Sequence, residues 1–514
     1  MNYLSSKEWI QEIVKNCLHF LSSIGCSDQP SSIDLTYLKS SYDNFSKEDL
    51  DTLHNIFLNE FEINDSILLL SYVIRILGIK DFTSDVALQI YKGNFDFFSQ
   101  IMLEIQLAFF DNIDYKLKRD IHRKSITCLS HELSINFPYI PLEKRNKNRV
   151  VIITEQLLED SSHAPTLMTL QTAYTLQQRF HYEVLIFTCA SNKVLPVTLW
   201  VDTYGFNSGE YGFKKRPYNN TLLPVYQYPL DSCSLTDYTQ MLTQIYDWNP
   251  MFVLNMGVNN PIADLPKSFT TLVCRDMSTT PPISEADILI RGISYNTTAE
   301  IAYKQSYSAH QTQLFMTQKF PAISYNSSAT FTRKDLNLPE DKFLIAIVGN
   351  RLDTEIDNDF LKILFCLLTK TTNIDFVIIG ETSHIQTCFS ETPYWKRIHF
   401  LGYCNSLLSV YQTLNLYLNP KRLGGGWSSA IALQAGLPVV TFPNCDVAYN
   451  VPDKFIVSSD QNMIETIIRY STDFIYYKQQ SKYAKEFSTV NNDQKIIEYV
   501  AELLTKIKEV LPND

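Results

Sequence analysis

The sequence lacks the features of several protein classes. Lysines and arginines number 44 against 55 aspartates and glutamates, and the net charge of −11 argues against a general nucleic-acid binder. The ten cysteines form no C-x-x-C pair and no metal-like Cys/His spacing, which favours reduced thiols in a cytoplasmic protein. No run of 18 or more apolar residues predicts a membrane span, and residues 1–9 do not resemble a signal peptide.

The sequence contains enough apolar residues for several hydrophobic cores. Its 514 residues, 45% of them hydrophobic, predict two to four domains. In residues 1–145 apolar side chains recur at helical spacing, glycine is scarce and no strand pattern is visible, so we expect an all-helical N-terminal domain. The polar, basic run at 143–149 is interpreted as a solvated linker.

Two stretches of alternating strands and helices follow. Within residues 150–330 strands are expected at 150–154, 183–188, 251–256, 271–274 and 286–290, with a loop-rich part from about 195 to 230. Within residues 335–490 they are expected at 343–348, 374–379, 397–402, 414–419 and 439–442. This alternation predicts an α/β fold with two parallel sheets covered by helices, each sheet a Rossmann-like, doubly wound domain. An amphipathic helix is expected near the end of the chain, at 492–510.

The stretch from Leu418 to Thr441 predicts a phosphate site. It has the order strand, glycine loop, helix, glycine and strand. Glycines let the backbone approach a ligand where a Cβ atom would block it, and a serine can cap the helix whose start attracts an anion. The phosphate-binding residues expected here are Lys421, Arg422, Gly424, Gly425, Gly426, Ser428 and Ser429. A glycine-rich turn of this kind also occurs without any ligand.

The spacing from this loop to the segment Ala435-Gly436-Leu437-Pro438-Val439-Val440 resembles the donor-binding segment of GT-B glycosyltransferases. These enzymes use nucleotide sugars and have two Rossmann-like domains that face a cleft. The resemblance covers most of residues 335–445. It implies an acceptor domain at 150–330, a donor domain at 335–490 and a C-terminal helix, 491–514, that packs back on the first domain.

The same resemblance implies roles for residues at other strand ends of the donor domain. Asn350 and Arg351 would meet the donor diphosphate, with Arg351 as a charge-assisted donor. The backbone around Leu401, Gly402 and Tyr403 would hold the nucleotide base. All of these residues follow predicted strands, where ligands of open parallel sheets bind.

Two positions depart from the family pattern. Leu423 and Ile431 stand where retaining GT-B enzymes often carry a pair of glutamates. Ile431 also stands where enzymes similar to O-GlcNAc transferase and to adhesin N-glycosyltransferases carry a ribose-binding aspartate. Either another residue holds the ribose, with Asp446 as the nearest acidic candidate, or the donor site is impaired.

A second resemblance lies in the first Rossmann-like domain. Ser161-Ser162-His163 is similar to a Ser-Ser-His of the bacterial adhesin N-glycosyltransferases, which also place an all-helical domain before the GT-B core. We expect His163 to be the catalytic base that takes the acceptor proton, since histidine titrates near neutral pH. The alternative is a helix cap or a packed loop histidine.

We expect no metal at the reaction centre. Helix N-termini and basic side chains can stabilise the leaving diphosphate. Asp357-Asn358-Asp359 looks like the D-x-D motif of metal-dependent transferases, but it falls at a predicted helix start, where aspartate is ordinary.

The sequence therefore predicts a cytosolic glycosyltransferase that moves a sugar from a nucleotide sugar, expected to be a UDP-sugar, to an acceptor. A protein such as a bacterial adhesin is favoured, and a surface-polysaccharide precursor is the alternative acceptor. Another alternative is a catalytically impaired GT-B protein that holds substrate for an active transferase, and a weaker one is a sugar epimerase or phosphorylase. Whether the chain forms homo- or hetero-oligomers is left open.

Overall fold

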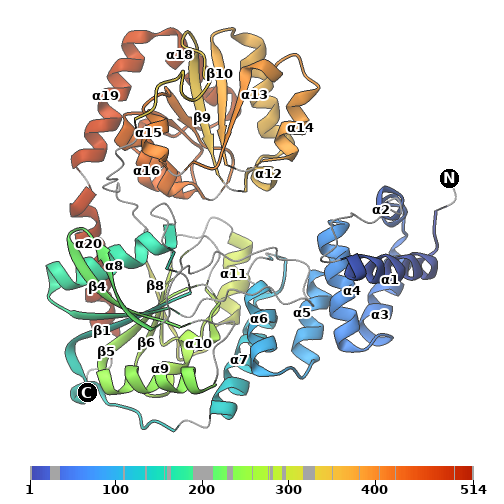
Figure 1. Cartoon of the computed structure of the whole chain (residues 1–514), viewed down its shortest axis with the longest axis vertical. Coiled ribbons are helices and arrows are strands. Elements are labelled where there is room, and N and C mark those ends of the chain that lie inside the picture. The colour runs from blue at the N-terminus through green and yellow to red at the C-terminus, as the bar shows by residue number, and fades with distance from the viewer. Residues whose placement is uncertain are drawn as a thin grey trace.

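A helical region and two α/β lobes make up the molecule, and the second lobe is stacked on the first along the long axis (Figure 1). The computed structural model describes residues 3–23, 35–107, 110, 112–133, 136–155, 157–158, 164–188, 212–228, 235–257, 259–275, 277, 282–291, 297–316, 330–349, 351–380, 382–404, 406–422, 424–490 and 492–511. None of the helices in these ranges has the length and hydropathy of a transmembrane segment.

The N-terminal region is helical, as expected. Its helices are α1 (Ser6–Ser23), α2 (Leu35–Asp43), α3 (Lys47–Asn59), α4 (Ile63–Ile76), α5 (Thr83–Lys92), α6 (Phe97–Leu107) and α7 (Tyr115–Leu133). Trp9, Phe57 and Phe82 are fully buried at its centre. A capping box starts α3, because Ser46 Oγ accepts from the Asp49 N–H at 3.2 Å while the Asp49 carboxylate accepts from the Ser46 N–H at 3.0 Å.

The first lobe contains an eight-stranded sheet in the order β3-β4-β2-β1-β5-β6-β7-β8. All neighbours are parallel except the hairpin β3–β4. Its elements are β1 (Asn146–Thr154), α8 (Ala164–Phe180), β2 (Glu183–Thr188), β3 (Gly212–Tyr218), β4 (Thr221–Gln227), α9 (Leu235–Trp248), β5 (Pro250–Met256), α10 (Pro261–Asp264), β6 (Leu272–Arg275), β7 (Ile288–Arg291), α11 (Thr297–Ser306) and β8 (Thr312–Phe315). Since β1 lies between β2 and β5, the strand order reverses at β1.

The second lobe repeats this design in a five-stranded parallel sheet, β11-β10-β9-β12-β13. Its elements are β9 (Phe343–Val348), α12 (Leu352–Glu355), α13 (Asn358–Lys370), β10 (Ile374–Ile379), α14 (His384–Ser390), β11 (Ile398–Gly402), α15 (Leu407–Tyr411), β12 (Leu416–Leu418), α16 (Gly426–Ala435), β13 (Val439–Val440), α17 (Asp446–Asn450), α18 (Asp460–Thr472) and α19 (Phe474–Val490). Every residue of β10 is buried, as expected for a strand covered on both faces. The two sheets confirm the predicted doubly wound α/β class.

The last helix, α20 (Asn492–Val510), leaves the second lobe and packs on the first (Figure 1). Val500, Leu503 and Ile507 join the core between the first sheet and α8. Trp427 and Ala430 of α16 belong to the same apolar cluster, so side chains from both lobes share it.

One sequence expectation about the first lobe is wrong. The basic run is not a solvated linker, because β1 begins at Asn146 and Arg145 is buried. Arg145 Nη1 donates to the Met251 carbonyl at 3.1 Å and to Thr271 Oγ1 at 2.6 Å, and these bonds replace water around the charge. The loop-rich part also contains a hairpin that the sequence did not predict, in which β3 and β4 pair across Asn219 and Asn220, both with positive φ.

Candidate functional site

The predicted donor residues gather at one edge of the second sheet. The strand order reverses at β9, which lies between β10 and β12, and ligands of such sheets bind beyond the carboxyl ends at this point. Arg351 follows β9, Tyr403 follows β11, and the glycine loop follows β12. Asn350 and Leu423 lie outside the described residues, as does the whole Ser161-Ser162-His163 segment.

Arg422 fastens the ends of β9 and β12 to each other. Its side chain is 5% exposed, and its Nη1 forms an ion pair with Glu355 Oε2 at 2.6 Å. Its Nη2 donates to the Val348 carbonyl at 2.6 Å, and its Nε donates to Asn419 Oδ1 at 3.0 Å. The guanidinium is thus bound by protein groups, which hold the loop after β12 to the end of β9.

Two glycines make room for this buried arginine. A Cβ atom on Gly349 would lie 2.4 Å from Arg422 Nη1. Gly425 has φ +106, and a Cβ there would lie 2.7 Å from Asn419 Oδ1 and 3.0 Å from Arg422 Nη2. By contrast, a Cβ on Gly424 would meet only Arg351 Nη2, at 3.9 Å. The loop therefore needs glycine at 425 for its own packing, while Gly424 presents open backbone beside Arg351.

The start of α16 has no side-chain cap. Gly425 is the N-cap residue, so Ser428 and Ser429 lie inside the first turn and the expected serine cap is wrong. Ser429 is fully buried, and its Oγ donates to the Gly426 carbonyl at 2.8 Å. The N–H groups of the first turn carry the partial positive charge of the helix, and with a glycine as N-cap no carboxylate or hydroxyl of the cap residue occupies that end.

Arg351 stands over the glycine loop. Its side chain is 73% exposed, and its Nη2 pairs with Glu355 Oε1 at 3.0 Å. The other carboxylate oxygen of Glu355 holds Arg422, so one glutamate orients two arginines. The sequence analysis missed Glu355, whose only signal is its position four residues after Arg351 at the end of a short helix.

Lys421 and Asp446 flank the loop on the side of β13. Lys421 Nζ forms an ion pair with Asp460 Oδ1 at 2.8 Å and lies 5.0 Å from the centre of the Phe442 ring. Asp446 is the half-buried first residue of α17, where a carboxylate suits the helix dipole. The helix that Asp446 starts ends at Asn450, whose Nδ2 donates to the Gly426 carbonyl at 3.1 Å.

The expected base-binding segment ends an edge strand. Gly402 has φ +64 at a register shift between β10 and β11, and its carbonyl accepts from the Gly380 N–H at 2.8 Å. Tyr403 is 46% exposed beside it, while Leu401 is half-buried. Ile431 is 4% exposed in the core of the lobe, so this position offers no polar group to a ribose.

The described residues contain no group of three or more His, Cys, Asp or Glu side chains arranged to hold a metal ion. Asp357 is the N-cap of α13 and accepts from the Phe360 N–H at 2.7 Å. The D-x-D segment is therefore a helix start, as the sequence indicated.

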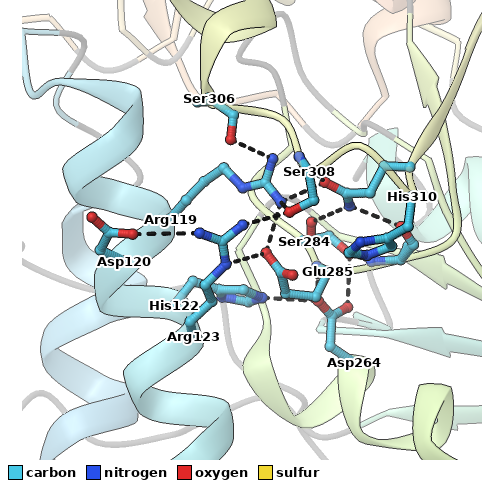
Figure 2. Close-up of polar contacts among 12 residues, drawn as sticks. Arg119, Asp120, His122, Arg123, Asp264, Ser284, Glu285, Ser306, Ser308 and His310 are labelled. Atoms are coloured by element: carbon cyan, nitrogen blue, oxygen red, sulfur yellow. Dashed lines mark hydrogen bonds and ion pairs between the residues drawn. The ribbon is translucent and has the colours of Figure 1, made fainter.

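A second polar cluster joins α7 to the first lobe (Figure 2). His122 is fully buried, and its Nε2 lies 2.8 Å from Asp264 Oδ2 while its Nδ1 contacts Glu104. Arg119 Nη2 and Arg123 Nε both bind Glu285 Oε1, at 2.7 and 3.0 Å. Burial disfavours the imidazolium of His122, but the two carboxylates outweigh burial and raise its pKa to about 10. This cluster fastens the helical region to the lobe.

Comparison with known proteins finds similarity at the level of structure. No family model and no curated protein sequence matches this chain. A mutant O-GlcNAc transferase of Thermobaculum terrenum is similar in structure, with a TM-score of 0.55 and 11% identity over 99% of this chain and 98% of the other. The chain has the GT-B fold. The match to the Thermobaculum protein extends over the helical region as well as the two GT-B lobes.

Other solved structures match a smaller share of the chain with lower TM-scores. The catalytic domain of starch synthase IV from Arabidopsis thaliana matches with a TM-score of 0.48 and 10% identity, over 71% of this chain and 99% of the other. The pneumococcal O-GlcNAc transferase GtfA matches with a TM-score of 0.44 and 11% identity, over 72% of this chain and 100% of the other. At 11% identity the match to the Thermobaculum protein shows the fold alone and does not show the function.

Proposed function

We propose that the protein is a glycosyltransferase that binds a nucleotide sugar, expected to be a UDP-sugar, in the second lobe and transfers the sugar to an acceptor held by the first. The observation that carries the proposal is the start of α16. It is a helix N-terminus without a side-chain cap at the strand-order reversal, with the open backbone of Gly424 beneath the exposed Arg351. Backbone N–H groups and a guanidinium together suit a diphosphate.

The proposed reaction needs no metal. The start of α16 and Arg351 would stabilise the negative charge that develops on the leaving diphosphate, as preorganised dipoles and cations do. Inversion is favoured because Leu423 and Ile431 replace the glutamate pair of retaining GT-B enzymes. His163 is the proposed base.

We further propose a protein as the acceptor and the cytosol as the compartment. The Ser161-Ser162-His163 segment and the helical region before the GT-B core support a protein acceptor. Seven described cysteines are free thiols, which fits a reducing compartment.

Thermal unfolding with a panel of UDP and GDP sugars tests the donor site. A ligand at 100 times its dissociation constant stabilises a protein by about 2.7 kcal/mol, which is a clear shift of the unfolding temperature. Stabilisation by a nucleotide sugar, and nucleotide release that requires an acceptor and persists in EDTA, are the expected results. An unfolding temperature that does not change with any nucleotide sugar at millimolar concentration would contradict the proposal that the protein is a glycosyltransferase.

One observation favours a second function. Ile431 is buried where related enzymes place a ribose-binding aspartate, so the donor site lacks that contact. A GT-B protein that holds substrate for an active transferase would have such a site. Mass spectrometry of co-expressed acceptor proteins separates the two functions, because only the enzyme adds a sugar when it is the sole transferase present.

A further inference from the structure

One buried arginine of the first lobe, Arg275, has no anionic partner among the residues that the structure describes. Arg275, the last residue of β6, is 3% exposed. Its Nη1 donates to Thr172 Oγ1 of α8 at a long 3.4 Å, and its guanidinium stacks on the Tyr499 ring of α20 at 4.5 Å. Its Nε has no hydrogen-bond partner, and no described carboxylate lies within the 4.0 Å of an ion pair.

Three other buried arginines have carboxylate, carbonyl or hydroxyl partners. Arg119 pairs with Glu285, and Arg422 pairs with Glu355. Arg145 lacks a carboxylate but donates to backbone carbonyls and to hydroxyl groups. Removing a charge from water without such partners is costly, so a buried guanidinium without a described carboxylate partner is suited to bind an anion.

The position of Arg275 fits an external anion. It lies at the carboxyl end of a strand, the edge where parallel sheets bind ligands. Val273, two residues earlier, belongs to the core beneath α8 and α20, which places Arg275 on that same face. Figure 1 shows α8 and the first turns of α20 at the side of the first lobe nearest the second.

Helix α16 of the second lobe contributes side chains to the apolar cluster that contains Tyr499. Trp427, in the first turn of α16, belongs to the same apolar cluster as Tyr499, the residue on which Arg275 stacks. The helix that starts without a side-chain cap and the ring on which Arg275 stacks therefore contribute to one apolar cluster between the lobes. The start of α16 and the Arg275 guanidinium come from different lobes, and both attract an oxyanion.

We propose that Arg275 binds a phosphate-type oxyanion of a ligand at the junction of the two lobes. The Nε edge of its guanidinium supplies the donors, and Tyr499 holds the plane of the group. The oxyanion belongs either to the donor diphosphate or to a phosphate on the acceptor. The inference rests on the proposed function only for the identity of the ligand, because the burial of Arg275 and its lack of a carboxylate partner among the described residues do not depend on that function.

Calorimetry and thermal unfolding of the full chain with inorganic pyrophosphate and with UDP test this inference. The variants are Arg275→Met and Arg275→Lys, and the control is Arg149→Met. Arg149 also stacks on a ring, that of Trp248 at 4.4 Å, but it pairs with Glu183 at 2.9 Å. We expect pyrophosphate to stabilise the wild type and the control. We expect Arg275→Met to bind pyrophosphate at least ~10-fold more weakly, the effect of one lost charge-assisted bond.

The unfolding temperature without anion separates binding from a structural role. If Arg275 serves to bind an anion, its buried charge is not compensated in the free protein and does not stabilise the fold. Arg275→Met should then unfold at the same temperature as the wild type or at a higher one. Unchanged pyrophosphate affinity in Arg275→Met, or a lower unfolding temperature without anion, would overturn the inference. Should Arg275→Met not fold, the same affinity criterion applies to Arg275→Lys, which keeps the charge but loses the planar fork.

The UDP measurements identify the source of the oxyanion. A parallel loss of UDP affinity in Arg275→Met assigns the site to the donor diphosphate. Unchanged UDP affinity with weakened pyrophosphate binding assigns it to an acceptor phosphate. A wild type that binds pyrophosphate but not UDP contradicts the proposed nucleotide-sugar donor and leaves the Arg275 inference supported, whereas a wild type that binds neither overturns both.

Discussion

At the scale of single residues, the site depends on how two arginines share one glutamate. Glu355 uses one oxygen for the buried Arg422 and the other for the exposed Arg351. The first pair fixes the loop, and the second holds a cation over the open backbone of Gly424. The sequence indicated positive charge beside the glycines, but it could not tell which arginine is buried, because burial depends on the contacts of Asn419 and the Val348 carbonyl.

Replacing Arg351 with alanine should weaken UDP binding about 10-fold, since the variant loses one charge-assisted hydrogen bond to the diphosphate. Isothermal titration calorimetry measures this. Lys362→Ala is the control, because Lys362 is similarly exposed and paired with Asp359 on the neighbouring helix α13. Equal UDP affinity of Arg351→Ala and the wild type would remove Arg351 from the donor site.

The two adjacent glycines should respond differently to alanine. Gly425→Ala places a Cβ 2.7 Å from Asn419 Oδ1 at a positive φ, so we expect a loss of ~2–5 kcal/mol of stability from backbone strain and overlap. Gly424→Ala meets no close atom and should change stability by less than ~1 kcal/mol, yet weaken UDP binding by covering the backbone. Urea unfolding and calorimetry check both variants. Equal stability of the two would contradict this account of the loop.

Replacing His163 with alanine should abolish sugar transfer and leave UDP affinity unchanged, because a base acts on the acceptor proton and does not hold the donor. Transfer rate and UDP affinity are measured on the same preparation. The neighbouring variant Ser162→Ala controls for general damage to this segment. A His163→Ala protein with full transfer activity would exclude this role.

At the scale of helices and strands, the sequence predicted the buried strands well. Strands 183–188, 343–348 and 374–379 have the predicted bounds, because runs of β-branched and aromatic residues between polar segments leave few alternatives. The edge hairpin was missed because β3 is exposed and basic, with Lys214, Lys215 and Arg216 in a row. Edge strands carry such residues, and no apolar pattern distinguishes them from loops.

The contact between α7 and the first lobe should weaken at high pH. The pKa of His122 is raised to about 10 from an ordinary 6.5, so the protonated ring stabilises the fold fully below pH 6.5. This contribution falls as the pH rises and is lost as it passes 10. Urea midpoints between pH 7 and 10 should decline more steeply for the wild type than for His122→Gln, and equal slopes would contradict the assignment.

Removing the His122 ring at neutral pH should be costly. His122→Leu leaves Glu104 and Asp264 buried without their shared cation, and breaking such a cluster typically costs ~3–5 kcal/mol. Urea unfolding at pH 7 measures the loss, and a variant as stable as the wild type would show that the carboxylates find other partners. No sequence pattern indicated this cluster, because Glu104, His122 and Asp264 are separated along the chain and come together only through packing.

At the scale of the whole molecule, the stability of the first lobe depends on α20, a helix that follows the second lobe in the sequence. Leu503 is 1% exposed in the core beneath α8, so Leu503→Ala should cost ~2–5 kcal/mol. In hydrogen-exchange measurements, Leu503→Ala should raise the exchange rates of α8 and β1 above those of the wild type more than it raises the rates of β9 and β10. Glu502→Ala, an exposed neighbour on the same helix, is the control. Faster exchange confined to the second lobe would contradict the packing of α20.

The comparisons agree with the order of lobes and helices rather than with particular residues. An identity of 11% together with alignment over nearly the whole chain means that the arrangement of elements persists while most side chains differ. The proposals on function therefore rest on the contacts of Arg351, Glu355 and Arg275 in this structure and not on the compared proteins.

Since α20 completes the first lobe, that lobe is assembled from two separate stretches of sequence. The second lobe is therefore inserted, in sequence, between β8 and α20 of the first lobe, which is its host domain, and it is connected to that host at both of its ends. A protein made by excising residues 335–490 and rejoining the flanks would keep the core residues supplied by α20 and lose only Trp427 and Ala430 from that cluster, whereas one that stops before 490 would lose all of α20.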